Sequence, residues 1–248
     1  MNRFDQSTPL FEEVVRLREA KLGRMHYDTQ DSVANLGINY RDAGRMQQAL
    51  PLLEEAYKSS QLNPSLEWVG HELLAAFVQA GDTRRATELV RELEAKARSN
   101  LPSTSAGLAK ESTRLGEALI KLAALDDGER ILRESLTIAD KVEPDAWNTF
   151  HTRTVLAAIL VAQKRFAEAE PLLLLGYEGM EQRKSSIPNS LRNNCLLEAL
   201  ARLVELYTAW DNPEKAAEWQ KKLDELNSRT TSLGSSPKTS PRGIALVS

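Results

Sequence analysis

Histidine and cysteine are the residues of this chain best suited to nucleophilic or metal chemistry, and they are few and dispersed. His26, His71 and His151 stand far apart, and none has a second histidine or a cysteine at ligand spacing. His71-Glu72 is followed by Leu-Leu-Ala-Ala, so the zinc-protease pattern H-E-x-x-H does not form. Cys195 lies in the apolar stretch NNCLLEAL, which favours a buried thiol over a nucleophile. The histidines are therefore interpreted as surface or groove residues, and no metal site is expected.

The sequence also lacks the motifs that bind or transfer phosphate. The 12 glycines are scattered singly, with no phosphate-cradling loop, and neither H-R-D nor D-F-G occurs. Carboxylates are plentiful, but in stretches such as LVRELEAKAR (89–98) they alternate with Arg and Lys, as on the solvated face of a helix. The sequence therefore predicts a protein that is not an enzyme and that needs no cofactor.

Composition sets further bounds. The 248 residues are 42% hydrophobic, enough to bury a core as one or two domains, and the Ala, Leu, Glu and Arg content favours helices. The net charge of -3 provides no basic field for nucleic acid. No apolar run approaches the roughly 20 residues of a membrane span, and the N-terminus does not look like a secretory signal. With a single cysteine, a cytoplasmic location is expected.

Five segments align without gaps, and they indicate the elements that position everything else. They cover residues 35–56, 72–93, 114–135, 155–176 and 202–223. In each, an apolar pair is followed three residues later by a large apolar residue, and nine residues further on by a small one. The small residues are Ala49, Ala86, Gly128, Ala169 and Ala216.

Each segment has the apolar spacing of two amphipathic helices. The turn between the two helices is marked by Ala43-Gly44, Ala80-Gly81 or Asp211-Asn212-Pro213, and prolines such as Pro64 and Pro102 mark the start of a new pair. A small residue nine positions after the large one would let the two helices of a pair approach closely. The sequence therefore predicts a repeated helix pair.

This template resembles the tetratricopeptide repeat (TPR), in the long variety found in kinesin light chains, over about residues 10–227. The stretch 12–57 carries the likeness most clearly. The closing stretch 201–226 also resembles the C-terminal repeat of some bacterial serine/threonine kinases. The resemblance implies an all-α protein, a right-handed α-solenoid of antiparallel helix pairs.

The expected layout is a solenoid over residues 1–227 and a disordered, Ser/Thr/Pro-rich tail over 228–248. The stretch LFEEVVRLREAKLG (10–23) resembles the second helix of a repeat, like 52–62, with its first helix missing. It suggests a fragment, a mis-started reading frame or one half of an interface. The repeats are expected at about 27–62, 65–99, 103–142, 145–183 and 189–227.

The resemblance also implies a ligand groove, because the first helices of such arrays line a concave face. Carried over by position, the groove candidates are Asn35, Arg41, Trp68, His71, Lys110, Arg114, Lys121, His151 and Arg202. The cations among them favour a carboxylate or an acidic segment, and the alternative is that they are ordinary solvated charges. Trp68 and Trp147 are either ligand anchors or packing residues.

Three functions remain open from the sequence. The first is a non-catalytic scaffold that binds a protein or peptide in the groove. The second is a regulatory or targeting module separated from a larger bacterial serine/threonine kinase. The third is a homo-oligomeric structural protein that pairs through its N-terminal half-repeat.

Overall fold

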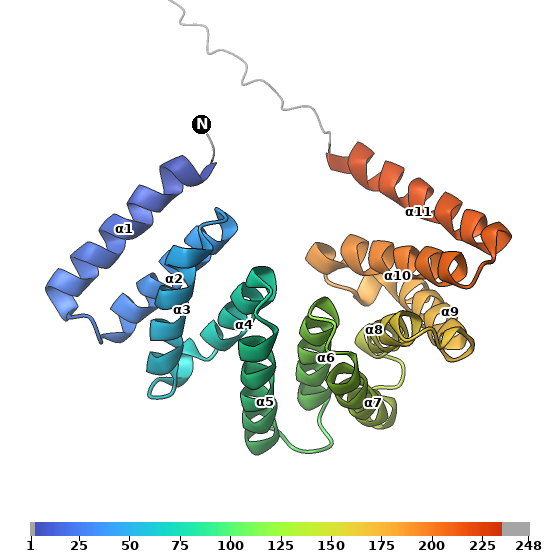
Figure 1. Cartoon of the computed structure of the whole chain (residues 1–248), viewed down its shortest axis with the longest axis horizontal. Helices are drawn as coiled ribbons and strands as arrows, with labels where there is room; N and C mark the ends of the chain where they lie inside the picture. The colour runs from blue at the N-terminus through green and yellow to red at the C-terminus, as the bar shows by residue number, and fades with distance from the viewer. Residues whose placement is uncertain (1–2, 235–248) are drawn as a thin grey trace, which may run out of the picture. The chain divides into compact units, whose positions relative to one another are not determined.

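The computed structural model describes residues 3–234, and within these residues the regular structure is entirely helical (Figure 1). The helices are α1 (Arg3–Leu22), α2 (Tyr27–Asp42), α3 (Met46–Ser60), η1 (Pro64–Leu66), α4 (Val69–Ala80), α5 (Thr83–Asn100), α6 (Ala106–Lys121), α7 (Leu125–Val142), α8 (Trp147–Ala162), α9 (Phe166–Gln182), η2 (Lys184–Ser186), α10 (Asn189–Ala209) and α11 (Pro213–Gly234). The predicted all-α repeat solenoid is thereby confirmed.

The helix pairs α2–α3, α4–α5, α6–α7, α8–α9 and α10–α11 share one turn geometry. In each pair a residue with left-handed backbone lies between the two helices, five positions before the small residue. These residues are Gly44 (φ 76°), Gly81 (68°), Ala123 (54°), Lys164 (62°) and Asp211 (57°). Only glycine adopts this conformation without steric cost, so the non-glycine turns are strained. Ala49, Ala86 and Ala169 are fully buried, as close helix approach requires.

The chain divides into two compact units, residues 1–138 and 139–248, where the sequence indicated one continuous solenoid. In the N-terminal unit a core cluster built on α3, α4, α5, α6 and α7 includes Leu53, Phe77 and Leu115. A second cluster joins α1, α2 and α3, and also contains Leu66 of η1 and Val69 of α4. The C-terminal unit has its own cluster, which includes Phe150, Met180 and Leu196.

Glycines set the closest helix contacts in both units. A Cβ added at Gly116 of α6 would lie 2.6 Å from Cγ of Leu132 in α7, and one at Gly37 of α2 would lie 2.9 Å from Cγ of Leu53 in α3. In the C-terminal unit, the space beside Gly179 of α9 is filled by the ring of Phe150 from α8. In the two recurring apolar pairs that contain a glycine, Gly37 and Gly116, a leucine of the second helix therefore occupies the space beside it.

The terminal helices are longer than the sequence indicated. α1 begins at Arg3 and not near residue 10. α11 runs to Gly234, so the tail boundary after residue 227 is placed too early. Residues 228–234 contain no proline, and Ser228 adds a side-chain hydrogen bond to the carbonyl of Asp224, so nothing ends the helix before Gly234. The remainder of the predicted tail, 235–248, lies outside the described residues.

Candidate functional site

A groove of about 410 Å³ lies between the first helices α4 and α6 of the N-terminal unit. Its floor is apolar and comes from Leu74, Val78 and Ala118. Its rim is polar or small and comprises His71, Glu72, Ala75, Gln79, Arg114, Glu117 and Lys121. An apolar floor beneath a rim of charged groups offers a ligand both hydrophobic and ionic contacts.

Arg114 and Lys121 are the lysine and arginine residues that line this groove. Both lie on the exposed side of α6, and neither forms a hydrogen bond or ion pair with another residue in the described range 3–234. They are seven residues apart, so helix geometry puts them on the same face, about 10 Å apart along the axis. Their charges therefore line the groove and are not neutralised by an ion pair within the described residues.

Arg41, in contrast, joins α2 to α4. Its Nη1 lies 2.7 Å from Oε2 of Glu72, its Nη2 lies 3.0 Å from Oδ1 of Asp42, and Gln79 donates to its backbone carbonyl. Burial acts to lower the pKa of Arg41, but hydrogen bonds to Glu72 and Asp42 outweigh it, and the pKa is raised above its ordinary value. With only 13% of its side chain exposed, Arg41 holds two repeats together.

His71 forms the corresponding link between α4 and α6. Its Nε2 lies 3.0 Å from Oε1 of Glu111, and both side chains are largely buried. His71 therefore both lines the groove and, through Glu111, links the two helices.

Two further candidates of the N-terminal unit also have structural contacts. Asn35 donates from Nδ2 to the carbonyl of Asp31 at 2.8 Å, which occupies its amide within α2. Trp68 packs against the hydrophobic cluster of α1, α2 and α3. Lys110 is exposed on α6, one turn before Arg114.

His151 and Arg202 belong to the C-terminal unit. Arg202 donates to Oγ1 of Thr154 at 3.0 Å and pairs with Glu198 at 3.4 Å. His151 lies 6.2 Å from the ring of Trp147, measured between centroids. Of the nine sequence candidates, the structure gathers His71, Arg114 and Lys121 around the α4–α6 groove.

The groove floor could not be recognised from the sequence. Leu74, Val78 and Ala118 read as ordinary core positions, because apolar residues at helical spacing are the same in a core and in a groove. The available signal is that Val78 follows Leu74 by one turn and that Ala118 follows the cationic Arg114 by one turn.

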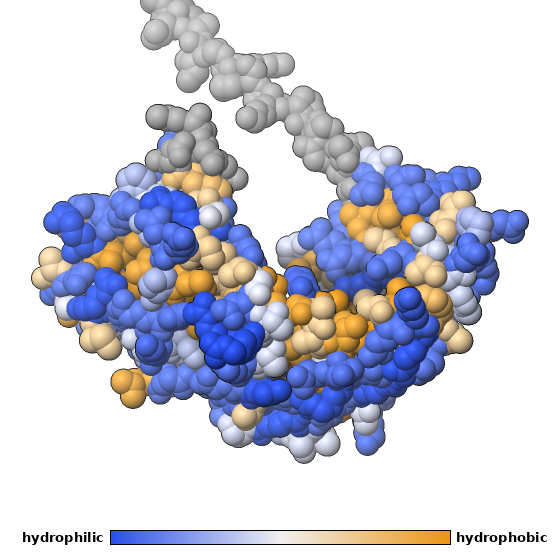
Figure 2. Space-filling view, viewed as in Figure 1, coloured by the Kyte–Doolittle hydropathy of each residue, from blue (hydrophilic) through white to orange (hydrophobic). Residues whose placement is uncertain are grey.

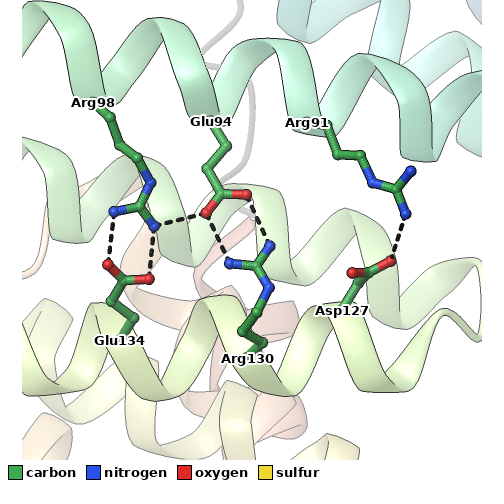
Figure 3. A network of polar contacts seen from close by, with 6 residues as sticks. All are labelled: Arg91, Glu94, Arg98, Asp127, Arg130 and Glu134. Atoms are coloured by element: carbon green, nitrogen blue, oxygen red, sulfur yellow. Dashed lines mark hydrogen bonds and ion pairs between the residues drawn. The ribbon is translucent and has the colours of Figure 1, made fainter.

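The second helices carry an ion-pair ladder on another surface of the same unit (Figure 3). Arg91, Glu94 and Arg98 of α5 pair with Asp127, Arg130 and Glu134 of α7, each with the residue 36 positions later. Arg130 and Arg98 hold the pKa of Glu94 below its ordinary value. Glu94 is only 7% exposed, so the interpretation of 89–98 as a solvated charged face is wrong at this residue.

Residues 3–234 contain neither a metal-binding cluster nor a helix that could span a membrane. No three His, Cys, Asp or Glu side chains in this range are grouped so as to hold a metal ion. None of the helices in this range combines the length and the apolar character of a membrane span. The Cys195 thiol is buried.

Comparison with known proteins gives the class to which this fold corresponds. The family model described as Tetratricopeptide repeat matches residues 29–61, which cover α2 and α3. No curated protein sequence matches the chain. The fold is therefore that of a tetratricopeptide-like repeat protein, as the sequence predicted.

Solved structures narrow the class. BtubC (BKLC) from P. vanneervenii is similar with a TM-score of 0.69 at 15% identity, over 100% of this chain and 99% of that chain. A putative kinesin light chain of Podospora anserina with nearly identical TPR-like repeats has a TM-score of 0.61 at 19% identity, over 81% of this chain and 95% of that chain. A variant of that protein with one substitution has a TM-score of 0.63 at 19% identity, over 82% of this chain and 96% of that chain. The helix pairs are thus of the kinesin-light-chain-like type.

Proposed function

We propose that this chain is a non-catalytic scaffold that binds an acidic segment of another protein in the groove between α4 and α6. Tetratricopeptide-like repeat folds are typically non-catalytic and mediate interactions between proteins. The observation that carries the proposal is the pair of unpartnered, exposed cations Arg114 and Lys121 on one wall of a groove with an apolar floor.

The spacing of the two cations limits the ligand. Seven residues of helix correspond to about 10 Å, and three residues of extended chain span about the same length. A segment in polyproline II conformation, which returns every third side chain to the same face at about 3.1 Å per residue, would therefore place two carboxylates, three residues apart, opposite Arg114 and Lys121. Apolar side chains between them would reach the floor made by Leu74 and Val78.

The test uses fluorescein-labelled peptides and the full chain. A peptide with two glutamates three residues apart and valine between them is compared with the same peptide carrying glutamines. We expect saturable binding of the glutamate peptide by fluorescence anisotropy, at least tenfold weaker binding of the glutamine peptide, and loss of affinity as salt rises.

Variants of the chain give the matched control. Arg114→Glu with Lys121→Glu should abolish binding. Arg84→Glu with Arg91→Glu makes the same charge change at the same seven-residue spacing on α5, where both side chains are exposed, and should leave binding intact. Equal loss in both double variants would show that net charge and not the groove determines binding, and no loss in either would show that Arg114 and Lys121 do not hold the peptide.

A further inference from the structure

A second cavity, of about 230 Å³, lies beside the groove in the N-terminal unit. His71 lines both cavities, but this one is otherwise bounded by different residues, among them Leu93 and Ala97 of α5 and Gly107 and Glu111 of α6. We call it the end pocket. An engineered apolar cavity of about 150 Å³ holds a benzene molecule, so the end pocket has room for one large side chain of a bound segment.

The end pocket and the groove follow one another along a single face of α6. Gly107 and Glu111 line the end pocket, and Arg114, Ala118 and Lys121 line the groove. Successive members of this series are four, three, four and three residues apart, which is the spacing of one helix face. Gly107 precedes Arg114 by seven residues, or about 10 Å along the axis, the same distance that separates Arg114 from Lys121. A segment that lies along α6 would therefore pass from the groove into the end pocket.

The end pocket contains a carboxylate oxygen without a partner. Glu67, which lies just before α4, is paired with Lys96, whose Nζ lies 3.1 Å from its Oε1. Glu111 has 21% of its side chain exposed, and its 3.0 Å contact with His71 uses Oε1. Oε2 of Glu111 forms no hydrogen bond or ion pair with any residue in the range 3–234. The unused capacity of the pocket is therefore that of an acceptor, which requires a donor from the ligand.

The wall of the end pocket is apolar. Leu93 and Ala97 of α5 and Leu101, directly after α5, form it. Figure 2 shows a similar mixture over the visible face of the N-terminal unit, where apolar patches lie among hydrophilic side chains. A long side chain with an apolar stem and a charged end matches a pocket that has an apolar wall and one free carboxylate oxygen.

We propose that the end pocket binds a lysine side chain of the acidic segment that the groove holds. The methylene stem would lie against the apolar wall, and the ammonium group would donate to Oε2 of Glu111. Lysine suits a single free oxygen, whereas the fork of an arginine binds best to both oxygens of a carboxylate. The inference rests on the proposed function, because Arg114 and Lys121 determine where the segment lies.

The spacing along α6 gives the position of the lysine. Every third side chain of a polyproline II segment returns to the same face, so the lysine lies three residues from the nearer glutamate. The two possible chain directions correspond to the peptides Lys-Ser-Ser-Glu-Val-Val-Glu and Glu-Val-Val-Glu-Ser-Ser-Lys. These peptides have the same composition and net charge, so each is the matched control for the other.

The test is titration of both fluorescein-labelled peptides with the full chain by fluorescence anisotropy. Each peptide is compared with a version that carries norleucine, which has an apolar stem and no charge, in place of lysine. We expect one of the two lysine peptides to bind at least fivefold more tightly than its norleucine version. Attraction to the cationic groove alone predicts the reverse, because lysine makes the peptide less negative.

Two variants of the chain locate the effect. Glu111→Gln keeps an acceptor for His71 and removes the charge, so it should abolish the gain from lysine and leave the norleucine peptides bound as before. Glu88→Gln removes the same charge from an exposed position on α5 and should preserve the gain.

Equal binding of lysine and norleucine peptides in both orders, or a gain from lysine that survives Glu111→Gln, overturns the proposal. In either case the groove still stands if the norleucine peptides bind and lose affinity in Arg114→Glu with Lys121→Glu. If none of the peptides binds, the groove and the end pocket are both wrongly assigned.

Discussion

Glu94 joins two arginines through one buried carboxylate, Arg98 from its own helix and Arg130 from α7 (Figure 3). Glu94→Gln removes the charge and leaves both guanidinium groups without it. We expect the free energy of unfolding to fall by about 1–3 kcal/mol, the range for disrupting a charged, mostly buried hydrogen-bonded group. Urea denaturation measures this change.

The control is Glu88→Gln, which breaks the exposed Arg84–Glu88 pair on the same helix. Exposed pairs contribute little, so the change should stay within about 0.5 kcal/mol. Equal effects of the two substitutions would mean that the ladder does not stabilise the contact between α5 and α7.

The pH dependence follows from the direction of the pKa shift. Arg130 and then Arg98 lower the pKa of the folded Glu94 below its ordinary value near 4.5. The stabilisation is therefore present above that value and is lost as pH falls through the lower, folded pKa. The wild type should lose stability between about pH 5 and pH 3, and Glu94→Gln should show a shallower loss over this window. Denaturation at several pH values tests this.

The ion-pair partners of single residues could not be predicted from the sequence. Arg114, Lys121 and Arg41 are all cations on first helices, and the sequence ranked them alike. Arg41 differs from Arg114 and Lys121 because it pairs with Glu72, which lies 31 residues later. A pairing partner in another repeat is set by the register of the helices, which the local pattern of one helix does not contain.

At the scale of elements, the left-handed turn residue can be tested directly. Lys164 has a φ of 62°, which costs an L-residue about 1–2 kcal/mol. Lys164→Gly should therefore stabilise the chain by up to about 1 kcal/mol after the greater flexibility of unfolded glycine is subtracted. Gly81→Ala, at the equivalent turn, should destabilise it by about 1 kcal/mol. If thermal unfolding shows Gly81→Ala to be more stable than Lys164→Gly, the two turns do not share one backbone conformation.

Close helix packing in the C-terminal unit gives a second test. A Cβ at Gly176 would lie 2.4 Å from Cγ2 of Thr154 and 2.8 Å from the carbonyl oxygen of Phe150, which is backbone and cannot turn away. Gly176→Ala should destabilise the unit by about 1–3 kcal/mol. Gly107→Ala is the matched change, because its nearest neighbours lie at 3.7 Å, and it should be neutral or stabilising by up to about 1 kcal/mol. Denaturant unfolding of both variants checks the contrast.

The elements themselves were predictable because the repeat is visible five times. Gly44, Gly81 and Asp211 are turn formers, and the sequence marked these turns correctly. Ala123 and Lys164 adopt the same conformation without any local signal, since neither residue type favours it. Packing of the flanking helices imposes it on them.

At the scale of the whole molecule, the two compact units predict how far the destabilisation caused by a substitution extends. Each unit has its own core cluster, and in repeat proteins stability is largely a sum of contacts between neighbours. Gly176→Ala should therefore speed amide hydrogen exchange in α8 and α9 and leave α2 to α5 unchanged. Mass spectrometry of exchanged peptides measures this, and uniform acceleration along the chain would indicate a single cooperative unit.

The left-handed turn residue always lies five positions before the small residue, yet successive turns are separated by 37, 42, 41 and 47 residues. The repeats therefore differ in length only outside the segment that runs from the turn residue to the small residue. Mutations that insert or delete residues during evolution can accumulate in connections such as 101–105 and 183–188 without disturbing a helix pair. The exposed stretch 102–104 of the first connection is where a sequence tag or a second domain can be inserted with least damage, whereas the second contains the buried core residue Ile187.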